Sequence, residues 1–287
     1  MQILTSSSPT IGFGDDGTLC STLRECAAET WILLETATRI GIDVGEETVT
    51  DLNLVRIQAR HPNDVFIRKF NRVVEGNHTG ADWMWWLGVP SSGKWICLRV
   101  QAKKLDIESS RYKKINYPGK TAAQLQMLIQ DAQLNSAIPM YCFYNYWPTG
   151  RRPPRWNCGT YPAAQVELQG CMLSSAEAIR GLKRNDRSDS LTVSVRSLPW
   201  HCLVCCQGYA RPNADLVDRA IGVLTRSFEI MASTIVVHPS PPGYVQKMML
   251  GGRRDASSST GLPEELPSEL SPGISYVMVT TEAARLG

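Results

Sequence analysis

The chain has 287 residues, of which 43% are hydrophobic and 20% are charged, with a formal net charge of +3. This length can bury one sizeable α/β core, and no run of about 18 apolar residues predicts a transmembrane helix. The first residues lack the pattern of a signal peptide, and nine cysteines, an odd number at irregular spacing, do not indicate a disulfide framework. We therefore expect no membrane partner and a reducing, cytoplasmic location.

Two helices are predicted before the first strand. Apolar residues recur at helical spacing over 19–40, within an N-terminal helical segment at 1–45, and this helix would pack on a sheet or mediate a homodimer. A second helix is predicted over 46–60, and the alternating run at 65–70 predicts the first strand. The positions expected to be buried are Leu23, Ala27, Trp31, Leu34, Ala37 and Ile40 in the first helix, and Val49, Leu52, Val55 (or the stem of Arg56) and Ala59 in the second.

A β-hairpin is predicted next, because a turn signal at 90–93, Pro-Ser-Ser-Gly, separates two apolar runs. If Pro90 pairs with Gly93, Asp82 falls opposite Gln101, and opposed residues share one face of a sheet. Lys103 lies on that same face. The other face is uniformly apolar and carries Trp83, Trp85 and Leu87 against Val100, Leu98 and Ile96.

The second half of the chain is predicted to continue the α/β pattern. A run of good helix formers at 121–134 precedes a buried-strand candidate at 139–146. A C-terminal α/β extension follows at 148–251. Residues 252–273, rich in Ser, Pro and Glu, predict a flexible linker, and the tail at 274–287 begins with an expected edge strand.

The cysteine pair Cys202 and Cys205 has the spacing of a zinc site. No second pair follows at a suitable distance, and the runs at 191–195 and 203–204 resemble strands. Core packing of these thiols is therefore favoured over a structural zinc ion.

The expected trio of Asp82, Gln101 and Lys103 suits metal-dependent attack of water on a phosphodiester. A carboxylate can hold Mg²⁺ with few other protein ligands, and a lysine beside it can position the water and stabilise the charged phosphate. The alternative needs no chemistry. Asp82 would then bond to backbone groups, and Lys103 with Lys104 would form a solvated strand end.

The sequences around this trio resemble the PD-(D/E)XK nuclease superfamily in its Mrr-like variant, where glutamine replaces the usual acidic residue. The resemblance rests on Asp82 on one predicted strand and on Val-Gln-Ala-Lys at 100–103 on the next. Gly-Ala-Asp-Trp at 80–83 and a later helix with an early glutamine also resemble an uncharacterised bacterial family associated with that superfamily. The resemblance spans residues 46–147 and implies a restriction-endonuclease-like α-β-β-β-α-β core with a mixed central sheet.

The resemblance also implies a metal site. Mg²⁺ or Mn²⁺ would be held by Glu47, Asp82 and Gln101, with Lys103 serving the attacking water. Asp51 and Gln124 would support these ligands from behind. The alternatives are local: Thr48 with Asp51 also fits a helix-capping pattern, and Gln124 is equally typical of a solvated helix.

Basic residues are concentrated between 94 and 120, where eight stand against two acidic residues, Asp106 and Glu108. A loop of this charge beside the predicted site would contact a phosphate backbone, and arginines beside tryptophans near residue 151 could hold phosphates or stack on a base. The alternative is a solvated loop. The predicted nucleic-acid contacts are Arg99, Lys104, Arg111, Lys113, Lys114, Arg151 and Arg152.

The sequence therefore predicts a metal-dependent nuclease acting on DNA, with a setting in bacterial restriction or phage defence implied by the resemblance. The competing hypothesis is a non-catalytic or partner-activated nucleic-acid-binding protein of the same fold. Under either hypothesis the C-terminal half, or a regulatory partner protein, would direct the site to its target.

Overall fold

The computed structural model of the chain describes residues 17–70, 80–113, 115, 124–148, 165–206, 213–252 and 273–282. The helices are α1 (Leu19–Ile40), α2 (Glu46–Arg60), α3 (Gln124–Leu134), α4 (Ala176–Gly181), α5 (Ser190–Ser194), α6 (Cys202–Cys205), α7 (Leu216–Arg226) and α8 (Gly243–Gly252). The strands are β1 (Val65–Lys69), β2 (Trp83–Val89), β3 (Lys94–Asp106), β4 (Arg111–Tyr112), β5 (Ile138–Tyr144), β6 (Cys171–Ser175), β7 (Leu198–Pro199) and β8 (Tyr276–Thr281).

One mixed sheet of eight strands organises the described chain, in the order β1-β8-β2-β3-β5-β6-β7, with β4 paired to the end of β3. Strand β3 is antiparallel to β2 and parallel to β5. Strand β8 is parallel to β2 and antiparallel to β1. The predicted α/β fold class is therefore confirmed, and strands from the N-terminal, central and C-terminal parts of the sequence share a single sheet.

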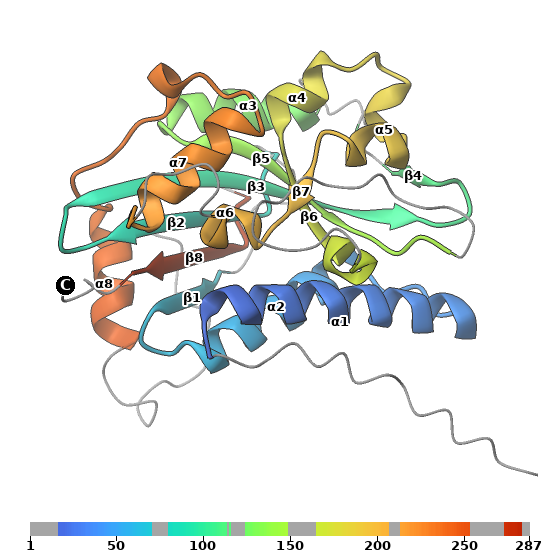
Figure 1. Cartoon of the computed structure of the whole chain (residues 1–287), viewed down its shortest axis with the longest axis horizontal. Helices are drawn as coiled ribbons and strands as arrows, with labels where there is room; N and C mark the ends of the chain where they lie inside the picture. Colours follow the sequence, from blue (N-terminus) through green and yellow to red (C-terminus); the bar gives the residue numbers. More distant parts are fainter. Residues whose placement is uncertain are drawn as a thin grey trace, which may run out of the picture.

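Helices cover both faces of this sheet. Side chains of α1, α2, α6 and α7 pack with Trp83, Trp85 and Val100 in one hydrophobic cluster. Side chains of α3, α4, α5 and α8 pack with Trp86 and Tyr141 in a second cluster on the opposite face. Figure 1 shows α1 and α2 side by side below the sheet, with α3 and α4 above it. The result is a three-layer arrangement with the sheet in the middle.

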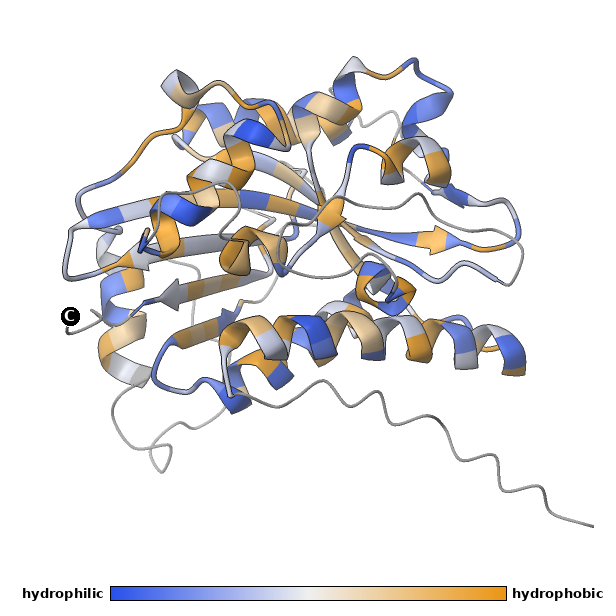
Figure 2. Cartoon of the chain, viewed as in Figure 1, coloured by the Kyte–Doolittle hydropathy of each residue, from blue (hydrophilic) through white to orange (hydrophobic). Residues whose placement is uncertain are grey.

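Helix α1 has the bounds expected from its sequence pattern. The Thr18 side chain accepts a hydrogen bond from the Ser21 amide at the start of the helix, and Gly41 ends it in a left-handed conformation. Figure 2 shows hydrophobic and hydrophilic stretches alternating along this helix. The expected buried positions are confirmed except for Ile40, which is 60% exposed at the last turn.

Helix α2 also has the predicted bounds, but the expected buried face is wrong. Leu52 and Val55 are 46% and 69% exposed. The true face is turned by about one position, because Thr50 and Asn53 bond to Tyr144 and Thr30 and belong to the interior. Its buried residues are Val49, Thr50, Asn53, Leu54 and Ile57.

Three expected strands are corrected. Residues 191–195 and 203–204 lie mainly in the short helices α5 and α6, where Asp189 caps the first of them. Short apolar runs do not distinguish a buried strand from a buried helix. Strand β8, expected at an edge of the sheet, lies inside it between β1 and β2.

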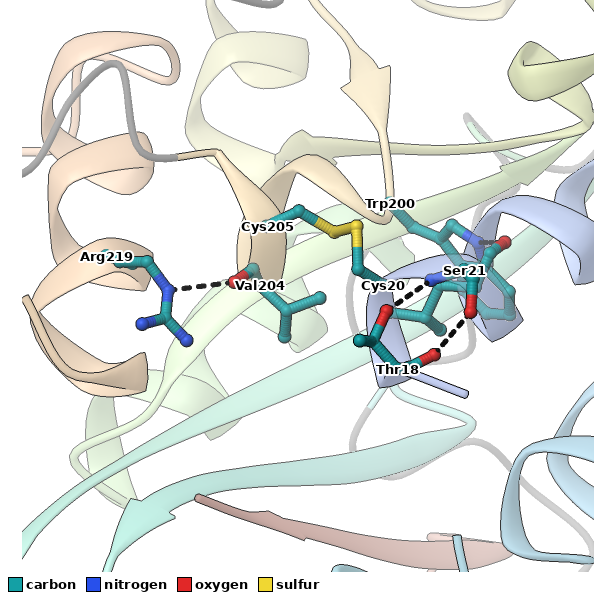
Figure 3. The surroundings of a disulfide bond; sticks show 8 residues. Thr18, Cys20, Ser21, Trp200, Val204, Cys205 and Arg219 are labelled. Carbon is teal, nitrogen blue, oxygen red and sulfur yellow. Dashed lines mark hydrogen bonds between the residues drawn. A yellow bond between two sulfur atoms is a disulfide. The ribbon is translucent and has the colours of Figure 1, made fainter. Parts of the chain in front are cut away.

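The cysteines also depart from expectation, because Cys20 and Cys205 form a disulfide with Cα atoms 5.6 Å apart. It joins the first turn of α1 to α6 (Figure 3). Cys202 is a buried free thiol, as core packing predicts. Since Cys205 is bonded to Cys20, the pair at 202 and 205 does not form the hypothetical zinc site.

No helix in the described ranges is long and apolar enough to cross a membrane. Several expectations fall outside those ranges: the predicted linker at 252–273, apart from its ends, and the predicted contacts Lys114, Arg151 and Arg152.

Candidate active site

The β2–β3 hairpin has the predicted register. The Gly93 amide donates to the Pro90 carbonyl in the turn, and Trp83 pairs with Val100. Continuing this register by one residue puts Asp82 opposite Gln101. The trio of Asp82, Gln101 and Lys103 therefore shares one face, as the sequence predicts, and the structure adds that α3 covers this face.

Asp82 is held by backbone hydrogen bonds to strands on both sides. Its amide donates to Val100 of β3 (2.8 Å), and its carbonyl accepts from the Ser275 amide just before β8 (2.8 Å). The C-terminal strand thus fixes the position of this carboxylate. Its placement inside the sheet makes β8 part of the support of the site.

Gly80 brings the chain before Asp82 into direct contact with α3. It adopts a φ of +68°, and a Cβ atom here would lie 2.6 Å from the Gln124 carbonyl and 2.7 Å from the Leu128 amide. Both contacts are with backbone, which cannot move aside as a flexible side chain can. Glycine is therefore required on conformational and on steric grounds.

We expect Gly80→Ala to destabilise the protein by about 1–3 kcal/mol and to reduce any activity of the site. The added methyl group would push α3 away from Asp82 and weaken the contact of Gln124 with Gln101. Urea unfolding measures the first effect, and the same substitution at Gly181, where nothing lies within 4 Å of a Cβ, is the control. Equal stability of Gly80→Ala and wild type would contradict the tight contact.

Hydrogen bonds join Asp82, Gln101 and Gln124 into one chain. Asp82 Oδ2 accepts from the Ala102 amide (2.8 Å) and from the Gln101 side-chain amide. Gln124 Nε2, in the first turn of α3, donates to Gln101 Oε1 (2.8 Å). The structure therefore brings the predicted Gln124 to the site, in contact with Gln101 rather than with solvent.

Lys103 is paired with Glu46, the first residue of α2, an acidic residue that the sequence does not single out. Lys103 is 3% exposed, and its Nζ lies 3.9 Å from Glu46 Oε1. The other oxygen of Glu46 accepts from the Lys104 amide at 2.6 Å. Glu47 is exposed in the same turn. The first residue of α2 therefore reaches β3, and the role expected of Glu47 as a metal ligand stays a prediction.

Asp51 lies with a second group of polar residues at the same end of the sheet. It pairs with Lys69 of β1 (2.9 Å) and accepts a hydrogen bond from the Tyr276 hydroxyl of β8. Burial, followed by the hydrogen bond to Asp51, raises the pKa of Tyr276 to about 12, so its phenol stays protonated at neutral pH. Asp51 is thus engaged by β1 and β8, and of these two strands only β8 is a direct neighbour of β2.

Two of the predicted basic contacts pair with carboxylates within the described chain, and a third bonds to neutral groups. Lys104 pairs with Asp43, and Lys113, although 70% exposed, pairs with Asp106 at 3.0 Å. Arg111 donates to the Asn185 carbonyl (3.0 Å) and to Ser188. Arg111 and Lys113 are exposed beyond the end of β3, and Lys104 is partly buried near the end of that strand.

Arg99 is corrected as a nucleic-acid contact. It is 1% exposed and lies 3.1 Å from Asp131 of α3, on the covered face of the sheet. A phosphate backbone on the surface cannot reach this guanidinium. In sequence, an alternating strand gives no sign of which basic residue is covered by a later helix.

The oxygen donors at the site suit a hard divalent cation. Asp82 and Glu46 supply carboxylates, and Mg²⁺ is commonly bound by one or two carboxylates with several waters. No group of three or more His, Cys, Asp and Glu side chains in the described ranges is arranged to hold a metal. Gln101 turns its side-chain amide nitrogen toward Asp82. For its side-chain oxygen to bind a metal ion, this amide group has to be turned over. Gln124 can still bond to the turned group, because its own amide can donate or accept. The donor types are those that Mg²⁺ or Mn²⁺ prefers, but in the described ranges these side chains are not arranged around a metal position.

Comparison with protein families places the chain by its sequence. A family model described as a family of unknown function, DUF6615, matches residues 19–282. No match is found among the curated proteins.

Proposed function

The chain belongs to the DUF6615 family, whose function is unknown, so its function has to be inferred from the candidate site. We propose that the protein is a metal-dependent nuclease that hydrolyses phosphodiester bonds of DNA. One observation carries the proposal: Asp82, Gln101 and Lys103 lie on one face of β2 and β3 and are met there by Glu46 and Gln124. Two helices and two strands thus converge on a carboxylate, an amide and a buried ammonium group.

The order of elements supports this proposal. Helix α2, strands β1, β2 and β3, helix α3 and strand β5 follow the α-β-β-β-α-β sequence of a restriction-endonuclease-like core. β3 and β5 are parallel neighbours, and the hairpin supplies the central pair. The main difference from the expected core is β8, which separates β1 from β2.

Each residue has a defined task in the proposed mechanism. Asp82 and Glu46 would hold the metal ion, and Gln101 would complete or orient this set. When bound, the ion would activate the scissile phosphate and the attacking water as a Lewis acid. Lys103 would stabilise the negative charge that develops on the phosphate oxygens, while Gln124 would fix the orientation of Gln101.

The direct test is cleavage of supercoiled plasmid and of labelled single- and double-stranded oligonucleotides, with Mg²⁺ or Mn²⁺ and with EDTA. We expect cleavage only with the metal ion. Cleavage that persists in EDTA, or the absence of cleavage of every substrate, would overturn the proposal.

Burial of the site favours a second candidate function, a partner-activated or non-catalytic nucleic-acid-binding protein. Gln101 and Lys103 are only 2% and 3% exposed, so substrate reaches them only if their cover shifts. Salt-sensitive DNA binding without cleavage would select this candidate. Either protein would act in the cytoplasm, in a bacterial restriction or defence setting, alone, as a homodimer or with a regulatory partner.

A further inference from the structure

A row of polar residues crosses the sheet at the level of the candidate site. Gln101 of β3 pairs with Tyr141 of β5, and Tyr141 pairs with Ser174 of β6. Asp82 stands opposite Gln101 on the other side. Paired residues share a face, so Tyr141 lies beside Gln101 under α3 and α4, where its ring also stacks on Phe143 (centroids 5.5 Å apart).

The hydroxyl of Tyr141 differs from those of neighbouring tyrosines. Its side chain is 0% exposed, and the oxygen has no hydrogen-bond partner within the described residues. The hydroxyl of Tyr112 donates to Asn145 (2.7 Å), and that of Tyr144 bonds to Thr50 (2.9 Å). A buried hydroxyl without a hydrogen-bond partner makes folding less favourable. The hydroxyl of Tyr141 therefore does not contribute to stability, which suggests a role other than a structural one.

Burial is the main reason that the phenol of Tyr141 stays protonated. Burial, and then the negative charge of Asp82, raises its pKa, and the opposing effect of Arg187 is smaller. At neutral pH the group is therefore an O–H donor close enough to Asp82 to respond to its charge. Ser174 is excluded from the same role, because its hydroxyl donates to the Arg196 carbonyl at 2.7 Å.

We propose that Tyr141 is a further catalytic residue of the site, whose phenolic O–H donates a hydrogen bond to a non-bridging oxygen of the bound phosphodiester. Once the cover over Gln101, Lys103 and Tyr141 has shifted to admit substrate, the phosphate supplies the partner that the hydroxyl lacks in the free protein. This inference rests on the proposed function, because it assumes that a phosphate group binds beside Asp82 and Gln101. It adds a neutral donor on β5 to the cationic Lys103 on β3.

The test is Tyr141→Phe, which removes only the hydroxyl and keeps the ring and its packing. We expect the midpoint of urea unfolding to stay unchanged or to rise, because an unpartnered buried polar group is lost. The rate of DNA cleavage at saturating substrate should fall about 10- to 100-fold, the size expected for one hydrogen bond to a charged phosphate. The matched control, Tyr112→Phe, removes a hydroxyl that has a partner, so it should lower the midpoint and leave cleavage unchanged.

The outcomes separate this inference from the proposed function. Wild-type cleavage with an equal rate for Tyr141→Phe would overturn the role of Tyr141 alone. If wild type binds duplex DNA without cutting it, the proposed function fails, and fluorescence anisotropy decides the inference: weaker binding by Tyr141→Phe supports it and equal binding overturns it. A wild type that neither binds nor cuts overturns both.

Discussion

Replacing Lys103 by methionine is expected to lower the rate of phosphodiester cleavage by about 10²–10³-fold with little change in stability. The ammonium group that would stabilise the charged phosphate is lost, while the methionine side chain fills nearly the same buried volume. Its partner Glu46 is 37% exposed and stays solvated, so no buried charge is left unpaired. Single-turnover cleavage of a labelled duplex with Mg²⁺, together with urea unfolding, measures both effects.

The matched control is Lys94→Met, on the same strand at its opposite end. Lys94 bonds to Asp215 (3.0 Å) and Asp218 (2.8 Å) near the surface. Its replacement should leave cleavage unchanged and cost about 1 kcal/mol or less in stability. A Lys103→Met protein that cuts at the wild-type rate would show that the cleavage activity belongs to another site.

The central hairpin could be predicted in detail because its information is local. The turn residues at 90–93 set the register, and the strict alternation of strand side chains then decides which residues share a face. Asp82, Gln101 and Lys103 were therefore placed together without any knowledge of the rest of the fold. Gln124 is predicted only by the resemblance, which implies a glutamine early in the next helix, and the residues alone leave a solvated glutamine equally open.

The features that could not be predicted from the sequence depend on contacts between distant parts of the chain. Glu46 and Glu47 are equally acidic neighbours, and only the position of α2 against β3 selects Glu46. The insertion of β8 beside β2 joins residues almost 200 positions apart, as in the bond from Trp85 to Thr280. No local pattern at either site specifies such a pairing. Cys20 and Cys205 illustrate the same limit.

Loss of the Cys20–Cys205 bond is expected to lower the free energy of unfolding by up to about 5 kcal/mol in the chain-entropy account. The cysteines are 185 residues apart, so the bond closes a very long loop in the unfolded chain. It also fastens the start of α1, which forms ion pairs with α2 through Glu25 and Arg60. Urea unfolding of the oxidised protein, with and without a thiol reductant, measures the loss.

Cys205→Ser is the control for that measurement, because it should unfold at the same urea concentration with and without reductant. Counting free thiols in the native and denatured wild type shows whether the bond is present. Since disulfides are rare in a reducing cytoplasm, nine free thiols in freshly prepared protein would favour that location and mean that α1 is held only by non-covalent contacts. If the bond is confirmed but its reduction leaves the unfolding midpoint unchanged, the expected stabilisation is contradicted. The contact between α1 and α6 would then be stabilised by the buried side chains around α6.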